Sequence, residues 1–178
     1  MKFNHYIIES SKDDYTGIFL GRIQGLTTAH VKIINTMSAT HPQNYVVIIK
    51  GDKSSLDTGR NPIPFEVQEK MVKRVLPSNV KIITAKSANL ENILPDLEGK
   101  AFAVYAGTDR VQDYRKYAAY IAKQGYNVKV IDIPREANDV SATKLRQSLK
   151  DNDIEAFKKV APKEVWDMFD ELRQEILR

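Results

Sequence analysis

Five apolar runs rich in β-branched residues recur along this sequence, and they constrain its fold more than any other feature. They cover residues 16–21, 44–50, 80–84, 101–107 and 127–133. The runs are mostly continuous rather than alternating between apolar and polar residues, which is typical of strands that are buried on both faces. Because parallel sheets bury both faces of their strands, the runs predict one parallel sheet.

Segments with helical spacing of apolar residues separate the five runs. These segments cover residues 28–40, 64–76, 89–97 and 110–124. Parallel strands need long crossover connections, which are usually helices, so the alternation is what a parallel sheet requires. The sequence therefore predicts the α/β class, with an open, mainly parallel, five-stranded sheet.

Only helical patterns follow the fifth run, at residues 141–149, 152–159 and 163–176. The last of them has an apolar stripe that either packs on the sheet or joins subunits in a homo-oligomer, and we favour packing. The stripe consists of Val165, Met168, Phe169, Leu172 and Ile176. We expect one domain, with an N-terminal extension at 1–15, the main part at 16–150 and its helical C-terminal part at 151–178.

Composition limits the classes of protein that fit. A chain of 178 residues can bury about 70% of its unfolded surface, which is enough for one core. Cysteine is absent, so a disulfide framework and a thiolate zinc site are excluded. No apolar run suits a secretory signal or a membrane span, and we expect a cytoplasmic protein without a membrane partner. The net charge of +4 comes from dispersed basic residues, which suits an anionic ligand and gives little support for nucleic acid.

The segment GRIQGLTTAH, residues 21–30, follows the first strand and leads into the first helix. Either Thr27 or Thr28 can cap that helix, which places His30 in its first turn. Ligands of open α/β sheets bind beyond the carboxyl ends of the strands, where a helix N-terminus offers unpaired N–H groups to an anion. His30 shares a helix face with Ile33, so we expect its ring to point towards the sheet. A capped helix with a core histidine explains the segment equally well.

A second helix start, VSATKLRQSL at residues 140–149, follows the fifth strand. Ser141 or Thr143 can cap this helix, and Arg146 lies three residues after Thr143 on the same face. A hydroxyl, exposed amides and a guanidinium at one helix N-terminus suit a polyphosphate, although an ordinary helix start with a solvated arginine remains open.

Together these segments resemble the nucleotidyltransferase superfamily, and most of all its nicotinamide-mononucleotide adenylyltransferases. Residues 21–30 are similar to the signature G-R-F-Q-P-x-[HT]-x-G-H, and VSATKLR is similar to I-S-[SA]-T-x-x-R. GRNPIPFEVQEKMV at 59–72 and AGTDRV at 106–111 resemble two further motifs of that branch. The resemblance covers about residues 16–150 and implies a Rossmann-like nucleotidyltransferase fold.

The resemblance also implies a reaction: AMP passes from ATP to nicotinamide mononucleotide, giving NAD and pyrophosphate. The implied partners are a nucleoside triphosphate and a small phosphorylated acceptor, with Mg²⁺ bound through the nucleotide phosphates and no protein metal site. His30, Thr27 and Arg146 would be the catalytic residues. The implied nucleotide contacts are Gly21, Arg22, Gln24, Thr27, His30, Ser141, Ala142, Thr143 and Arg146. The implied substrate contacts are Arg60, Asn61, Gly107 and Asp109.

The sequence departs from the first signature at three positions. Ala29 replaces its glycine, Gly25 its proline and Ile23 its phenylalanine. The methyl group of Ala29 would stand where the nucleotide approaches the helix closely. Ala29 and Gly25 suggest one alternative, a nucleotide-binding or interaction module without turnover. A cytidylyltransferase, or an enzyme with another acceptor, is a second alternative, because loop contacts set the specificity for base and acceptor.

Overall fold

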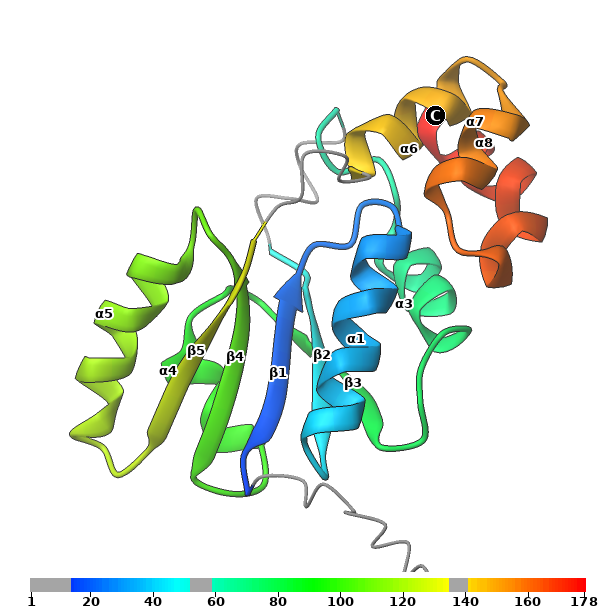
Figure 1. Ribbon diagram of the computed structural model, residues 1–178. Coiled ribbons are helices and arrows are strands. Elements are labelled where there is room, and N and C mark those ends of the chain that lie inside the picture. Colours follow the sequence, from blue (N-terminus) through cyan, green and yellow to red (C-terminus); the bar gives the residue numbers. More distant parts are fainter. Residues whose placement is uncertain (1–13, 52–58, 135–140) are drawn as a thin grey trace, which may run out of the picture.

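The five apolar runs form one parallel sheet in the computed structural model, which describes residues 14–51, 59–134 and 141–178 (Figure 1). Its strands are β1 (Thr16–Gly21), β2 (Asn44–Ile49), β3 (Val80–Ala85), β4 (Ala101–Gly107) and β5 (Asn127–Ile133). The strand order is β3-β2-β1-β4-β5, and every neighbouring pair is parallel. The predicted fold class is confirmed, and each strand ends within one residue of its predicted end.

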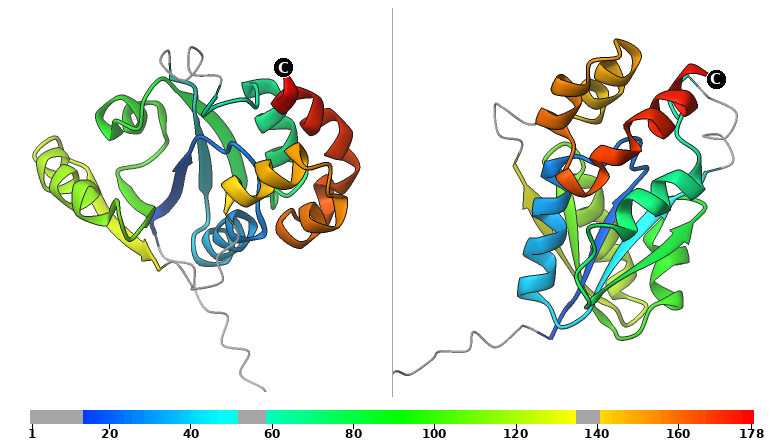
Figure 2. Two further views of the ribbon diagram at one scale, coloured as in Figure 1. Left: turned by 90° about the horizontal axis from the view of Figure 1, so that it is seen from above. Right: turned by 90° about the vertical axis from the view of Figure 1, so that its right-hand side faces the viewer.

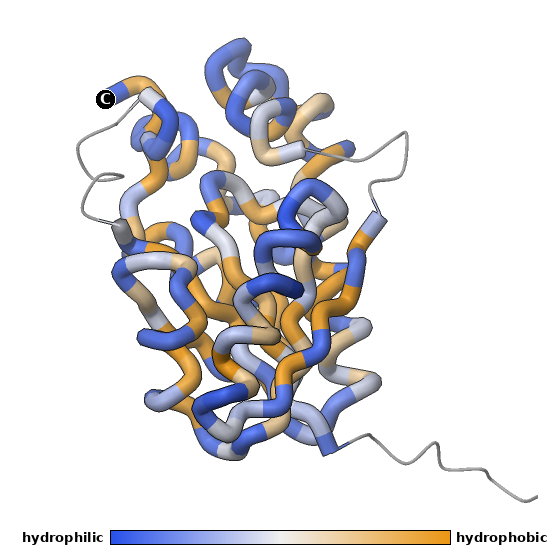
Figure 3. Tube along the Cα trace, turned by 90° about the vertical axis from the view of Figure 1, so that its left-hand side faces the viewer, coloured by the Kyte–Doolittle hydropathy of each residue, from blue (hydrophilic) through white to orange (hydrophobic). Residues whose placement is uncertain are grey.

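Helices cover both faces of the sheet, as Figure 2 shows from above. The helices between successive strands are α1 (Thr28–Thr40), α3 (Phe65–Lys73), α4 (Leu90–Ile93) and α5 (Val111–Ala122). α1 and α3 belong to one apolar cluster, whereas α4 and α5 belong to a second cluster on the opposite face. Figure 3 shows hydrophobic residues concentrated in the middle of the molecule, along the strands. The central strands therefore have apolar neighbours on both sides, which explains their continuous apolar runs.

The helix predicted at 89–97 is shorter than expected. α4 ends at Ile93, and a 3-10 turn, η1 (Leu94–Asp96), completes the segment. Pro95 lies in that turn, where it has no N–H to continue the α-helical bonding. Asn89 caps the start of α4 by accepting a hydrogen bond from the N–H of Glu91 at 3.0 Å.

The C-terminal part is helical, as predicted, and stands above the carboxyl ends of the strands (Figure 1). It consists of α6 (Ala142–Lys150), α7 (Ile154–Val160), the 3-10 segment η2 (Lys163–Met168) and α8 (Phe169–Leu177). The single helix predicted at 163–176 is thus two segments. Trp166 donates to the carbonyl of Ala161 at 3.0 Å, which ties η2 to the end of α7.

The apolar stripe of the last segment packs within the chain. Val165, Met168, Phe169 and Leu172 are buried in the cluster that also contains residues of α3, α6 and α7. Ion pairs reinforce the contact with α3: Lys70 with Glu171 at 2.6 Å, and Arg74 with Asp167. The preferred reading, packing, is therefore correct, but the stripe rests mainly on other helices and not on the sheet alone.

The chain reverses its direction across the sheet between β1 and β4. From β1 it proceeds outward through β2 to β3, and it then returns to β4 beside β1 and proceeds to β5. At such a switch point the two outgoing connections leave in opposite directions, so a crevice opens beyond the strand ends, and ligands of α/β proteins bind there. No helix among the described residues is long and apolar enough to cross a membrane.

Candidate active site

The N-terminus of α1 is closed by a reciprocal pair of hydrogen bonds between Thr27 and His30. Thr27 is the capping residue: its hydroxyl accepts from the N–H of His30 at 3.4 Å. The N–H of Thr27 in turn donates to Nδ1 of His30 at 3.0 Å. This is a capping box in which a histidine takes the place of the usual glutamate or glutamine. Since Nδ1 accepts a hydrogen bond, a neutral His30 ring holds its proton on Nε2.

The His30 ring lies against the sheet, as the helical spacing predicted. Its centroid is 5.8 Å from that of Phe19 on β1, and the two rings are inclined by 46°. Burial lowers the pKa of His30 to about 4, because the protonated ring would lose water without gaining a counter-charge. His30 is therefore neutral at neutral pH and can donate one hydrogen bond, from Nε2.

The N-terminus of α6 is capped by Ser141, whose hydroxyl accepts from the N–H of Lys144 at 3.2 Å. Arg146, one turn further along, donates from Nη1 to the carbonyl of Gln24 at 2.8 Å and from Nη2 to the hydroxyl of Thr143 at 3.4 Å. Partial burial lowers the pKa of Arg146 from its ordinary value. The guanidinium thus links α6 to the loop before α1, and its remaining N–H groups can bind a ligand.

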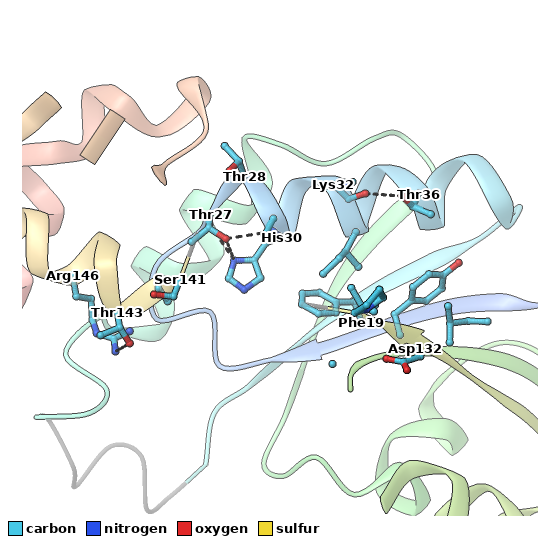
Figure 4. A pocket seen from close by; sticks show the side chains of 18 residues that line it. Phe19, Thr27, Thr28, His30, Lys32, Thr36, Asp132, Ser141, Thr143 and Arg146 are labelled. Atoms are coloured by element: carbon cyan, nitrogen blue, oxygen red, sulfur yellow. Dashed lines mark hydrogen bonds between the residues drawn. The ribbon is translucent and has the colours of Figure 1, made fainter. Parts of the chain in front are cut away.

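Both helix N-termini open into one pocket of about 950 Å³ at the carboxyl edge of the sheet (Figure 4). We call it the first pocket. Several residues that the sequence predicted as ligand contacts line it: Thr27, His30, Gly107, Ser141, Ala142, Thr143 and Arg146. Ala29, in the first turn of α1, also lines the pocket. Two anion-binding helix ends, one on each side, suit a polyphosphate.

A second pocket of about 750 Å³ adjoins the first. The two share Phe19, Tyr105 and Gly107, which lie on β1 and β4 at the switch point. The predicted contacts Gly21, Arg22 and Asp109 line this second pocket instead of the first. Lys86 and Arg110 also line it, so the charged side chains that the described part of the chain contributes are three cations and one carboxylate: Arg22, Lys86, Arg110 and Asp109.

Three of the predicted contacts lie outside the lining of both pockets: Gln24, Arg60 and Asn61. Gln24 is buried, and its amide bonds the backbone of Ile63 twice, donating to the carbonyl at 3.0 Å and accepting from the N–H at 2.9 Å. It connects the loop before α1 to the NPIPF segment, which is a structural task. Arg60 is exposed and Asn61 is half-buried.

Sequence reasoning missed several residues that line the first pocket. Tyr105 and Asp132 lie at the carboxyl ends of β4 and β5, and Lys32 and Thr36 lie further along α1. The rule that ligands bind beyond strand ends could have identified the first two. Lys32 and Thr36 had no such signal, because helical positions facing a pocket and facing water carry the same polar residues.

Among the described residues, no group of three or more His, Asp or Glu side chains could hold a metal ion by themselves. A magnesium ion that is bound through nucleotide phosphates needs only one or two protein ligands, so the donor set is compatible with it. Among the described residues, the acidic residues that line the pockets are Asp109 in the second and Asp132 in the first.

The sheet order, the flanking helices and the crevice at the switch point define an open α/β fold with a five-stranded parallel sheet. Comparison with protein-family models gave no match, and neither did comparison with curated proteins. Solved structures are similar in fold. One is the nicotinic acid mononucleotide adenylyltransferase of Plasmodium falciparum complexed with NaAD, with a TM-score of 0.62 and 19% identity over 93% of this chain and 99% of that one.

Two further similar structures also concern nucleotides. A bifunctional NMN adenylyltransferase/ADP ribose pyrophosphatase of Francisella tularensis, complexed with AMP and a manganese ion, has a TM-score of 0.59 and 13% identity, over 93% of this chain and 52% of that one. TmcAL of Thermotoga maritima, bound with alpha-thio ATP, has a TM-score of 0.59 and 11% identity, over 92% of this chain and 56% of that one. At sequence identities this low, the structural similarity shows a likeness of fold alone.

Proposed function

We propose that this protein is an adenylyltransferase that transfers AMP from ATP to nicotinamide mononucleotide, giving NAD and pyrophosphate. The observation that supports it most is the convergence of two capped helix N-termini, with His30 and Arg146, on one pocket at the switch point of the sheet. The fold likeness to adenylyltransferases of pyridine mononucleotides supports the same class of reaction.

The reaction needs no covalent intermediate with the protein. An oxygen of the acceptor phosphate attacks the α-phosphorus of ATP, the bond from that phosphorus to the bridging oxygen breaks, and pyrophosphate leaves with both electrons. Catalysis then consists of aligning the two substrates and stabilising the charge that develops on the α-phosphate and on the leaving group. Magnesium, held through the phosphates, would neutralise part of that charge.

His30 and the start of α1 act at the α-phosphate. The neutral ring presents its Nε2–H while Nδ1 remains bound to the N–H of Thr27. A donor fixed in this way pays no reorganisation cost as charge develops on the α-phosphate oxygens. The low pKa keeps the ring in this donor form throughout the neutral range.

The start of α6 holds the β- and γ-phosphates. Ser141 and Thr143 supply hydroxyls, the first turn supplies backbone N–H groups, and Arg146 supplies a guanidinium. Charge-assisted hydrogen bonds from arginine to phosphate are among the stronger polar interactions in proteins. The bond from Arg146 to the carbonyl of Gln24 fixes the guanidinium before the nucleotide arrives.

The second pocket receives the acceptor. Its three cations, Arg22, Lys86 and Arg110, suit the phosphate of a mononucleotide, and it meets the first pocket at Phe19 and Gly107. An acceptor phosphate placed there lies next to the α-phosphate held at His30, which is the alignment that the transfer requires.

One observation favours a second candidate, a nucleotide-binding module without turnover. Ala29 lines the first pocket on the helix that would contact the α-phosphate. Its methyl group can hold the nucleotide a little away from the amides of α1, and transfer depends steeply on such placement. A cytidylyltransferase, or an enzyme with another phosphorylated acceptor, has the same fold and the same catalytic geometry.

Pyrophosphate release, measured with magnesium, separates these candidates. We expect release only when ATP and nicotinamide mononucleotide are both present, and little release when CTP replaces ATP. Arg146→Ala should weaken ATP binding and turnover, whereas the matched variant Arg115→Ala, on the exposed side of α5, should alter neither. ATP binding without release under all acceptors would establish the module, and release with CTP alone would establish a cytidylyltransferase.

A further inference from the structure

The loop before α1 touches α6 directly at Gly25. This glycine is buried, and a Cβ added to it would lie 3.0 Å from Cδ2 of Leu145 and 3.6 Å from Cβ of Ala142. Both of those residues lie in the first half of α6, and Leu145 is fully buried. A carbon–carbon distance of 3.0 Å is shorter than the ordinary van der Waals contact of about 3.5–4.0 Å. The backbone of the loop therefore packs against α6 so closely that a side chain at this position has no room.

The backbone conformation at this position requires glycine for a second reason. The φ angle of Gly25 is +126°, in a region that residues with a Cβ rarely adopt. The nucleotidyltransferase signature has proline here, and the proline ring fixes φ at about −65°. Gly25 therefore gives the loop a conformation that proline excludes.

The loop and α6 are both held from their far sides. The amide of Gln24, the residue before Gly25, makes its two hydrogen bonds to the backbone of Ile63. Gln68 of α3 donates to the same carbonyl of Ile63 at 2.8 Å, which ties the segment to that helix. On the other side, Leu145 belongs to the apolar cluster that joins α6 to α3, α7 and α8. A side chain at position 25 would therefore strain the junction between the loop and α6 itself.

That junction carries the guanidinium of the proposed phosphate site. Arg146 follows Leu145 directly, and its Nη1 donates to the carbonyl of Gln24 at 2.8 Å. This carbonyl belongs to the peptide unit that leads into Gly25, and the same loop continues to Thr27, the cap of α1. A wider separation of the loop from α6 would thus move Arg146 away from the N-terminus of α1.

We propose that Gly25 is a positioning residue that sets the separation of the two helix N-termini, so that α6 reaches the β- and γ-phosphates of a nucleotide whose α-phosphate lies at α1. This inference rests on the proposed function for the identity of the ligand and the placement of its phosphates. Gly25 itself lines neither pocket, so it acts through Arg146 and the start of α6.

The test is Gly25→Ala, which adds one methyl group where Leu145 stands. Isothermal titration calorimetry, with magnesium and without an acceptor, measures the affinities for ATP and for AMP, which lacks the phosphates assigned to α6. We expect the affinity for ATP to fall about 10-fold or more, the equivalent of one hydrogen bond to a charged group, while the affinity for AMP changes little.

Gly125→Ala is the matched control. Gly125 also has a positive φ, of +87°, but a Cβ added there would meet nothing within 4 Å. The substitution therefore adds backbone strain without a new contact, and it should lower Tm while leaving the affinity for ATP unchanged. An equal loss of ATP affinity in Gly125→Ala and Gly25→Ala would overturn the proposal, because the loss would then follow from general destabilisation.

Two variants of Leu145 test the contact from the side of α6. Valine has no Cδ, so the double variant Gly25→Ala/Leu145→Val removes the atom that the added methyl group would meet. It should recover most of the affinity for ATP, although its Tm should lie below that of Gly25→Ala. Leu145→Phe enlarges the contact while leaving the backbone of Gly25 unstrained, and it should weaken the binding of ATP more than that of AMP.

The proposal is overturned if Gly25→Ala leaves the affinity for ATP unchanged, or if the double variant recovers none of it. It is also overturned if the wild type binds ATP no more tightly than AMP. Pyrophosphate release is measured separately. Selective ATP binding that Gly25→Ala weakens, without release by the wild type, would refute the proposed transfer reaction and leave this inference standing.

Discussion

Replacement of His30 tests the site most directly, because the ring has a structural and a proposed chemical task at different atoms. His30→Ala removes Nδ1, the acceptor for the N–H of Thr27, and the ring that packs on Phe19. Leaving that N–H without its partner costs about 1–2 kcal/mol, and the lost ring contact adds about 0.5–1 kcal/mol. For a chain of this length, a loss of about 2 kcal/mol lowers Tm by about 4–8 °C.

His30→Asn separates the two tasks. The asparagine Oδ1 can take the place of Nδ1 and accept from Thr27, but it provides no donor where Nε2–H stands. We expect differential scanning calorimetry to show that His30→Asn recovers about half of the lost Tm. Turnover should stay about 100-fold below wild type in both variants, as for other donors to a transition-state oxyanion. Recovery of turnover together with Tm in His30→Asn would refute the catalytic assignment and leave a helix cap.

Three further predictions concern stability and affinity. The lowered pKa of His30 means that the unfolded chain takes up a proton below about pH 6.5 while the folded chain does not until about pH 4. The free energy of unfolding should therefore decrease as the pH is lowered through that window. Urea unfolding at pH 7 and at pH 5 should show that the wild type loses about 2 kcal/mol more of this free energy than His30→Asn does. Gln24→Ala should cost about 2 kcal/mol in the same assay, because the N–H of Ile63 loses its acceptor, whereas the exposed Gln147→Ala should cost less than about 0.5 kcal/mol. Ala29→Gly should tighten ATP binding in calorimetry while lowering stability by about 0.5–1 kcal/mol, and weaker binding would contradict the proposed crowding by the methyl group.

The strands were predictable because a strand that is buried on both faces has a continuous run of apolar residues. Val46, Val47 and Ile48 are fully buried in β2, and such a run has few readings other than a central parallel strand. The ends of the last helical segment were less predictable. The pattern from Val165 to Ile176 fits one helix, but helical spacing does not distinguish a 3-10 segment followed by an α-helix.

The position of the first pocket was predictable from the two helix starts that open into it. Thr27 and Ser141 both proved to be capping residues, and their helices open into one pocket. The resemblance implies that Gln24 contacts the nucleotide, whereas in the structure its amide bonds the backbone of Ile63, which lies 39 residues away in sequence. No local pattern encodes a partner at that distance, and for the same reason the division of the predicted contacts between two adjoining pockets could not be foreseen.

Arg146, which we propose binds the triphosphate, lies on α6, and α6 packs in one apolar cluster with α7, α8 and α3. His30 lies on α1, where its ring packs on Phe19 of β1. Glu171 and Asp167 fasten that helical group to α3 through ion pairs. Substitutions in α8 can therefore change the position of Arg146, and with it the affinity for the nucleotide, although residues of α8 do not contact the nucleotide. Residues so remote from the chemistry are the first place to search when natural variants of this chain differ in affinity but share an unchanged pocket.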